Sequence, residues 1–176
     1  MNKLKELTWN THHNAERTAF AKKLLRGIDP VDYHRYLVNQ YEIYNALETA
    51  AESVLSDFPH IARAENIKQD IEELEVTYTL GFDPTMLCPV VEEYKTYVSN
   101  LDRKGLLAHL YVRHFGDMYG GQIIKSRNPG SGKMYDFDDV ETLKQTVRAQ
   151  LSDDMADEAN CCFEFAIQLF KELSGE

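Results

Sequence analysis

The sequence is short of several features that mark large classes of protein. Its 176 residues include only three cysteines, Cys88, Cys161 and Cys162. Two of these are adjacent in a helical pattern and cannot easily bridge each other, and none has zinc-site spacing, so we expect reduced, mostly buried thiols. No apolar run approaches the roughly eighteen residues of a membrane span, and the N-terminus is polar rather than signal-like. These absences predict a soluble, cytoplasmic protein with no signal peptide or membrane anchor.

Positive charge is also scarce. Lysine and arginine number 19 against 29 acidic residues, which gives a net charge of −10. Because phosphate backbones are bound by basic surfaces, this balance argues against a general nucleic-acid partner. The chain carries no flavin or nicotinamide fingerprint, and its length fits one domain spanning residues 1–176.

Strand-like alternation of apolar and polar residues is almost missing. Apolar residues recur at spacings of three and four instead, which predicts an all-α fold. Gly27, Asp29 and Pro30 mark a helix stop followed by a restart, with Asp29 as the cap and Pro30 as the first helical residue. The pattern predicts helices over about 3–16, 19–26, 31–55, 62–78, 90–100, 106–125, 140–151 and 153–173.

Three glycines interrupt the helical pattern of residues 106–125. Each glycine inside a helix costs roughly 0.5–1 kcal/mol relative to alanine, so three of them within six residues require a compensating reason. Either the bare backbone lets a flat ligand approach, or it admits a neighbouring helix or a loop. A carboxylate on the same face favours the ligand, because an unpartnered aspartate there would be costly. Helical spacing places on this face Arg113, Gly116, Asp117, Gly120 and Gly121.

One of the six histidines, His12, lies in a pattern that suggests ligand binding. It shares a helical stripe with Lys5, Trp9 and Glu16. Lys5 precedes it by seven residues, roughly 10 Å along a helix axis, so a ligand centred on His12 would place an anionic edge near Lys5. A lone helical histidine is more often an ordinary core or surface residue. The shared stripe favours a ligand-binding role for His12.

Lys144 and Arg148 form a second basic pair, four residues apart in an acidic chain. Alone, the pair indicates a solvated helix face. Together with Lys5 it forms a cationic cluster suited to carboxylates, since arginine can bind a carboxylate through two hydrogen bonds. A histidine, a bare helix face and a cationic rim together describe a pocket for haem, which is flat and carries two propionates.

Four segments of the chain resemble the haem oxygenase family. Residues 12–16 resemble its proximal helix, and residues 109–122 resemble its distal-helix signature over fourteen positions. Residues 144–148 are similar to its propionate-binding helix, and residues 167–170 to its closing helix. The distal match is specific, whereas the proximal one would be weak by itself. The chain departs from the family at Ala166, where animal members have an asparagine, and at Tyr119, where a serine is usual.

The resemblance implies a single-domain multi-helix bundle with haem sandwiched between proximal and distal helices. His12 would be the axial iron ligand with Glu16 beside it, and His13 matches no ligand position. The other expected haem-binding residues are Lys5, Tyr111, Lys144 and Arg148. The expected catalytic residues are of two kinds. Three glycines would form the surface that packs over haem: Gly116, Gly120 and Gly121. A proton-delivering water network would be held by Asp117, Arg113 and Tyr44, with Tyr97 as a further candidate.

The resemblance also implies a reaction. Members cleave haem at a meso carbon, most often the α position, to biliverdin, ferrous iron and carbon monoxide, using dioxygen and external electrons. Haem b would be both substrate and cofactor. The electron donor would be a ferredoxin or a similar reductase, and a bilin reductase would be a possible downstream partner. Two alternatives stay open: a haem-binding or storage protein without turnover, and a thiaminase-like enzyme on the same fold, which would need a cysteine nucleophile.

Overall fold

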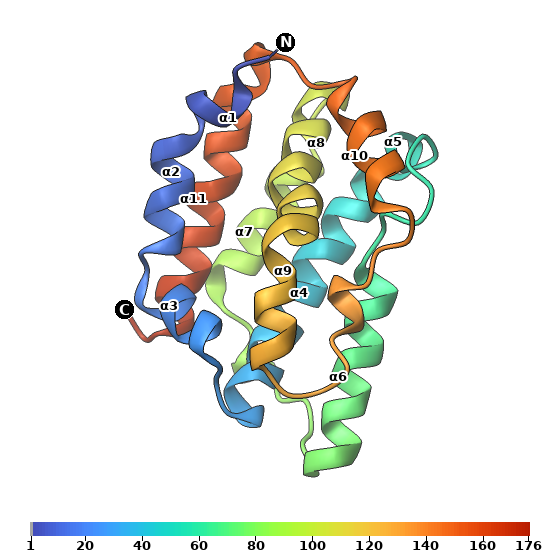
Figure 1. Cartoon of the computed structure of the whole chain (residues 1–176). Coiled ribbons are helices and arrows are strands. Elements are labelled where there is room, and N and C mark those ends of the chain that lie inside the picture. The colour runs from blue at the N-terminus through green and yellow to red at the C-terminus, as the bar shows by residue number, and fades with distance from the viewer. Residues whose placement is uncertain (1) are drawn as a thin grey trace.

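A computed structural model describes residues 2–176 and shows helices with no strand in that range (Figure 1). The predicted all-α fold is therefore confirmed. The helices are α1 (Leu4–Leu7), α2 (Trp9–Glu16), α3 (Ala19–Arg26), α4 (Pro30–Ala50), α5 (Glu52–Leu55), α6 (Ala64–Tyr78), α7 (Pro89–Val98), α8 (Arg103–Leu110), α9 (Gly116–Arg127), α10 (Val140–Arg148) and α11 (Ala156–Leu173). A π-helical turn spans Tyr111–Phe115, and short 3-10 turns span Pro84–Met86, Lys133–Tyr135 and Asp153–Met155.

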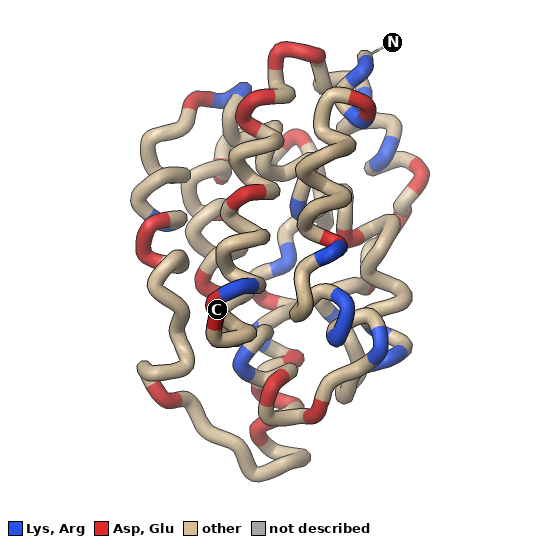
Figure 2. Tube along the Cα trace, turned by 90° about the vertical axis from the view of Figure 1, so that its left-hand side faces the viewer, with Lys and Arg blue, Asp and Glu red and all other residues tan. Residues whose placement is uncertain are grey.

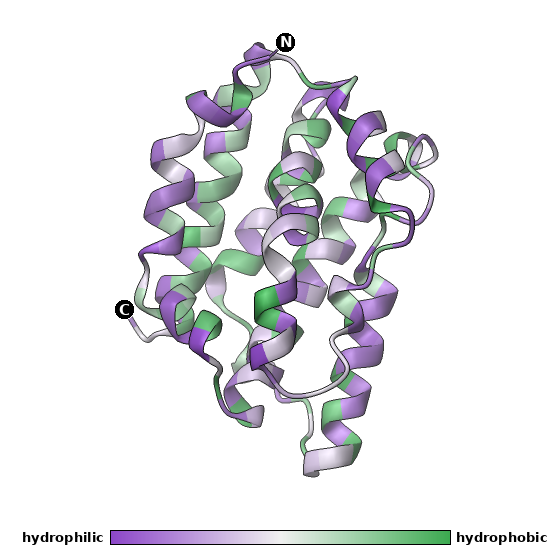
Figure 3. Cartoon of the chain, viewed as in Figure 1, coloured by the Kyte–Doolittle hydropathy of each residue, from purple (hydrophilic) through white to green (hydrophobic). Residues whose placement is uncertain are grey.

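Two groups of helices flank the central α8 and α9 segment. α2 packs along α11 on one side, and α10 lies on the other side (Figure 1). Behind them, α4 packs against α6 and α7 and supplies much of the core through Tyr33, Tyr36, Leu37, Ile43 and Leu47. α2 and α10 present mainly hydrophilic residues in the view of Figure 3. Within residues 2–176, no helix has the length and apolar composition required to cross a membrane.

The first predicted helix is divided in two. Thr8 lies between α1 and α2, is buried, and its hydroxyl donates to the carbonyl of Leu4 over 2.9 Å. A threonine that bonds back to the preceding turn in this way tends to bend a helix. The prediction of one continuous helix over residues 3–16 was therefore wrong.

The long tyrosine-rich helix begins as predicted but ends earlier. The Asp29 carboxylate accepts from the backbone N–H of Asp32 over 2.9 Å, and Pro30 occupies the first turn. The helix stops at Ala50, and the fully buried Ala51 takes a non-helical conformation before the short α5. The predicted extension to residue 55 is thus a second helix.

The glycine-bearing segment is helical without a gap from Arg103 to Arg127. Its irregularity is the π turn at Tyr111–Phe115, which precedes the first glycine. A π turn inserts an extra residue and rotates the helix that follows. The glycines are therefore part of a regular helix. The π turn before them changes the helical register and so sets the direction in which they face.

Candidate functional site

His12 is held in α2 by two contacts. Its ring stacks on Phe163 of α11, with centroids 5.1 Å apart and planes inclined by 12°, and its Nε2 lies 2.7 Å from Glu16 Oε1. The side chain nevertheless keeps 46% of its surface exposed. His12 is therefore an oriented imidazole that is still open to a ligand.

His13 takes a different direction from its neighbour. Its ring stacks on Trp9 at 5.8 Å with an inclination of 9°. The expected stripe of Lys5, Trp9, His12 and Glu16 is thus split, because Trp9 pairs with His13 and the bend at Thr8 separates Lys5 from α2. The pairing of His12 with Glu16 agrees with the expectation.

Two of the three glycines in α9 present bare backbone to open space. A Cβ placed on Gly116 or Gly120 would meet no atom within 4 Å. Gly121 differs, because a Cβ there would lie only 2.1 Å from Cδ1 of Tyr135. The expectation that all three glycines share one open face was wrong for Gly121, whose lack of a side chain admits the Tyr135 ring.

Ile123 was not anticipated as a site residue. It is a large apolar side chain with 53% of its surface exposed, and it follows Gly120 by three residues on α9. Its spacing from Gly116 and Gly120, at seven and three residues, was the available signal. An exposed isoleucine beside bare backbone extends the apolar surface that a flat ligand could cover.

Asp117 is bonded directly to Tyr44, a residue expected to share a water network with it. The Tyr44 hydroxyl of α4 donates to Asp117 Oδ2 over 2.5 Å. Burial of the carboxyl group raises the pKa of Asp117 to about 7, against the opposing effects of the Tyr44 hydrogen bond and the charges of Arg113 and Arg63. A carboxyl group with such a pKa can hold or release a proton near neutrality, the property required of a general acid.

Arg113 lies buried behind the distal face. Its Nε donates to the hydroxyl of Tyr94 over 3.0 Å, and its guanidinium lies 4.4 Å from the centre of the Tyr94 ring. Its second terminal nitrogen, Nη2, is buried and has no hydrogen-bond partner within residues 2–176. A buried cationic donor without a partner is a site for an ordered water molecule.

The tyrosine beside Arg113 is Tyr94, whereas the sequence suggested Tyr97. The Tyr97 hydroxyl instead donates to Glu158 Oε1 over 2.6 Å. The Tyr94 hydroxyl also lies 2.7 Å from His109 Nδ1, and His109 Nε2 lies 2.9 Å from Glu158 Oε1. Both tyrosines lie on α7 three residues apart, so helical spacing alone could not tell which would reach Arg113.

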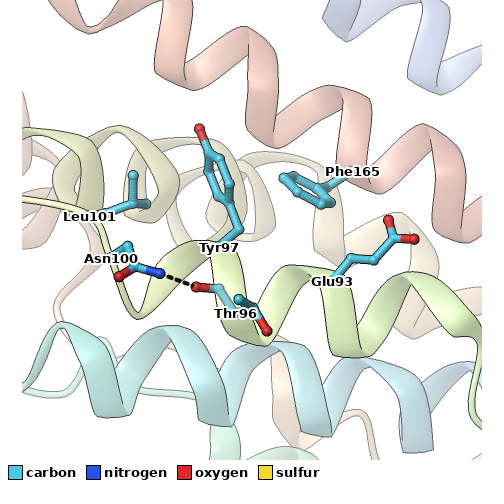
Figure 4. Close-up of a pocket in the computed structure, with 6 residues that line it drawn as sticks. All are labelled: Glu93, Thr96, Tyr97, Asn100, Leu101 and Phe165. Atoms are coloured by element: carbon cyan, nitrogen blue, oxygen red, sulfur yellow. Dashed lines mark hydrogen bonds between the residues drawn. The ribbon is translucent and has the colours of Figure 1, made fainter.

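This hydrogen-bonded chain joins α7, α8 and α11 through Tyr97, His109 and Glu158. Tyr97 lines a groove between α7 and α11, shown in Figure 4, whose other lining residues are Glu93, Thr96, Asn100, Leu101 and Phe165. Apart from Tyr97, none of the predicted site residues borders this groove. We therefore do not assign it to the candidate site.

The two basic residues of α10 meet the distal helix at an aromatic side chain. The Arg148 guanidinium donates to the hydroxyl of Tyr119, and Lys144 Nζ lies 4.0 Å from the centre of the Tyr119 ring. Tyr119 in turn packs edge-on against Phe115, with centroids 5.1 Å apart. The structure thus brings Lys144 and Arg148 together beside the glycine-bearing helix.

Lys5 and Tyr111 lie near the junction of the N-terminal segment and the distal helix. Lys5 is exposed on α1. Burial raises the pKa of Tyr111, and a hydrogen bond with Thr8 opposes the rise. Tyr111 of the π turn therefore contacts the segment three residues beyond Lys5.

The parts of the site fit a flat, dianionic ligand with a central metal. An exposed imidazole can supply one axial bond, bare backbone leaves room for a planar ring, and basic side chains can hold carboxylates. The family model described as heme oxygenase matches residues 1–172 of the chain. The chain belongs to the haem oxygenase family. This family cleaves haem to biliverdin, with haem as substrate and prosthetic group.

Individual relatives agree with the family match. The chain is similar to heme oxygenase 1 of Nostoc sp., with 29% identity over 205 residues that cover 99% of this chain and 85% of that protein. It is similar to the heme oxygenase of Pyropia yezoensis, with 30% identity over 207 residues and coverage of 99% and 85%.

Solved structures share the fold. The crystal structure of heme oxygenase-1 from the cyanobacterium Synechocystis, in complex with heme, matches with a TM-score of 0.82 and 26% identity, covering 98% of this chain and 91% of that one. Heme oxygenase from Leptospira interrogans matches with a TM-score of 0.80 and 25% identity, with coverage of 96% and 97%. The haem oxygenase fold is thereby confirmed for this chain.

Proposed function

We propose that His12 binds the haem iron and that Asp117 organises the proton supply on the opposite face of the haem. The Glu16 carboxylate lies beside Nε2 of His12, which leaves Nδ1 as the nitrogen available for iron in this conformation. Stacking on Phe163 fixes the plane of the imidazole. His13 is turned toward Trp9 and has no part in this assignment.

The observation that carries the proposal is the half-buried carboxyl group of Asp117 beside the open backbone of Gly116 and Gly120. The bound Tyr44 hydroxyl fixes its orientation, and its pKa of about 7 allows it to give a proton through water at neutral pH. The Nη2 of Arg113, which has no hydrogen-bond partner among the described residues, supports an ordered water in the same region. When bound, haem supplies the iron at which dioxygen is activated.

The basic residues have an orienting task in this proposal. Lys144 and Arg148 on α10, with Lys5 on α1, would hold the two propionates and so fix how haem is rotated in its plane. That rotation decides which meso carbon faces the activated oxygen. The α carbon, preferred by most members of the family, is our expectation for this chain.

The storage alternative is less well supported. Binding haem without turnover needs neither a half-buried acid with a raised pKa nor bare helix backbone open to a ligand, and the chain has both. The thiaminase-like alternative needs an accessible cysteine nucleophile. Cys88 and Cys162 are buried, and the half-buried Cys161 donates its thiol to the Tyr97 hydroxyl over 3.3 Å.

Electrons would come from a ferredoxin or a similar reductase. Figure 2 shows acidic residues spread along the chain and basic residues in short groups. An acidic donor would dock against basic side chains, and we propose Lys144 and Arg148 of α10 as that pair. A bilin reductase is the proposed consumer of the product. The three free thiols are compatible with the reducing cytoplasm proposed as the location.

A hemin titration tests the proposal. We expect a histidine-ligated absorption spectrum and, after addition of ascorbate or reduced ferredoxin in air, conversion to biliverdin with release of carbon monoxide. A stable hemin complex that yields no biliverdin with either reductant would instead favour storage. Failure to bind hemin through histidine would contradict the site assignment.

A further inference from the structure

Tyr119 lies where the basic residues of α10 meet the distal helix. The residue keeps 51% of its surface exposed, and it belongs to the same stretch of α9 as the open Gly116 and Gly120. The Arg148 guanidinium bonds to its hydroxyl, and the Lys144 ammonium lies 4.0 Å above its ring. One phenol therefore contacts both cations at once.

These two cations lack a close anionic partner. Among residues 2–176, Arg148 has no carboxylate within ion-pair distance, and the one carboxylate near Lys144 is Glu141 Oε1, at 3.7 Å. The Glu141 side chain is 83% exposed, whereas Lys144 is only 16% exposed. Exposed pairs of this kind contribute little. The positive charge at Tyr119 is thus available to an anion from outside the chain.

The direction of the hydrogen bond leaves a donor unused. A guanidinium has no acceptor, so Arg148 donates and the Tyr119 oxygen accepts. The hydroxyl hydrogen of Tyr119 is then free to point elsewhere. A carboxylate that approaches Arg148 would meet this O–H as a second donor and the Lys144 ammonium as a third. Phenol and guanidinium together fix the direction of a carboxylate better than either group alone.

We propose that Tyr119 binds one propionate of haem, by donating its hydroxyl hydrogen to the carboxylate that Arg148 holds. Its ring also provides the surface on which Lys144 rests. The inference rests on the proposed function, because it assumes haem in the site. Tyr119 then contributes to fixing the in-plane rotation of haem, and so to the choice of meso carbon.

The test compares Tyr119→Phe with the unaltered chain. The variant keeps the ring beneath Lys144 and loses only the hydroxyl. We expect hemin release to an excess of apomyoglobin to be about tenfold faster, the loss that follows from one hydrogen bond to a charged group. Proton NMR of the cyanide-bound ferric complex should show a larger share of a second set of haem methyl resonances. Tyr78→Phe, which alters another exposed tyrosine at the end of α6, is the matched control and should change neither measurement.

Hemin dimethyl ester separates propionate binding from packing. Esterification removes the negative charge, so the difference between the unaltered chain and Tyr119→Phe should disappear with this ligand. A difference that persists with the ester would show that Tyr119 acts by packing and would overturn the inference. Equal release rates and equal NMR spectra with ordinary hemin would overturn it as well.

The outcome for the unaltered chain keeps the two proposals distinct. If it binds hemin through histidine and releases biliverdin, the proposed function stands whatever Tyr119→Phe does. If it fails to form a histidine-ligated complex, both proposals fall. A mixture of biliverdin isomers from Tyr119→Phe, against one main isomer from the unaltered chain, is the additional result expected in turnover.

Discussion

The hydroxyl of Tyr44 lies 2.5 Å from the carboxylate of Asp117 and joins helix α4 to the distal helix α9. Tyr44 is buried, so the bond fixes the acid from the core side. Asp117 belongs to the same helix as the open backbone of Gly116 and Gly120. This pair therefore connects core packing to the surface on which haem is proposed to lie.

Loss of the Asp117 carboxylate should separate binding from turnover. We expect Asp117→Ala to bind hemin with nearly unchanged affinity, because the iron ligand and the basic residues are intact. Biliverdin formation should fall by about 10²–10⁴-fold, the usual contribution of a positioned general acid. Hemin titration and biliverdin absorbance measure the two effects. Turnover at the rate of the unaltered chain would show that the proton path does not involve Asp117.

The two adjacent histidines should respond differently to substitution. His12→Ala removes the oriented imidazole and should abolish the histidine-type hemin spectrum. His13→Ala removes only a ring stacked on Trp9 and should leave that spectrum unchanged. The pair forms its own control, because both changes fall in one turn of α2. Loss of the spectrum in the His13 variant alone would reverse the assignment.

Stability should depend on pH through Asp117. Its pKa is about 7 in the fold, against an ordinary value of 3.8 for an aspartate. The folded state therefore binds the proton more tightly, and the associated stability is present below about pH 4 and lost as pH rises toward 7. Asp117→Asn has no ionisable group at this position, so it should not lose this stability as pH rises. Its side-chain carbonyl can still accept a hydrogen bond from Tyr44. We expect the unfolding free energy of the unaltered chain, measured in urea without haem, to fall by about 2 kcal/mol relative to that of Asp117→Asn between about pH 5 and pH 8. A constant difference would contradict the raised pKa.

Removing basic residues should loosen the orientation of haem before it prevents binding. Hydrogen bonds to charged groups contribute about 1.5–3 kcal/mol, so the double variant Lys5→Ala, Arg148→Ala should retain some hemin. Its product should be a mixture of biliverdin isomers, separable by chromatography. One unchanged isomer at full hemin occupancy would show that these residues do not set the rotation.

The glycines of α9 should divide into two kinds. Gly121→Ala places a methyl group against the Tyr135 ring and should lower the unfolding free energy by about 1–3 kcal/mol. Gly120→Ala meets no atom within 4 Å and should raise it by about 0.5–1 kcal/mol while weakening hemin affinity. Urea unfolding without haem and hemin titration measure these effects. Equal destabilisation by both variants would contradict the packing described here.

The sequence alone determined the helical class, the cap at Asp29 and the bare backbone of Gly116 and Gly120 beside Asp117, and it indicated His12 as the expected iron ligand. These features are local: they depend on periodicity, capping chemistry and residue type within a few turns. The family resemblance reached the same residues through their order along the chain. The individual roles of the site residues stay predictions until they are measured.

Tertiary structure decided the contacts that helical periodicity leaves open. Tyr94 and Tyr97 lie three residues apart on α7. Only the packing of α7 against its neighbours determines that Tyr94 bonds to Arg113 and Tyr97 to Glu158. Likewise, Gly121 faces Tyr135, which is fourteen residues further along the chain. Spacing fixes which face of a helix a residue occupies, but the element opposite that face is chosen by the burial of the whole core.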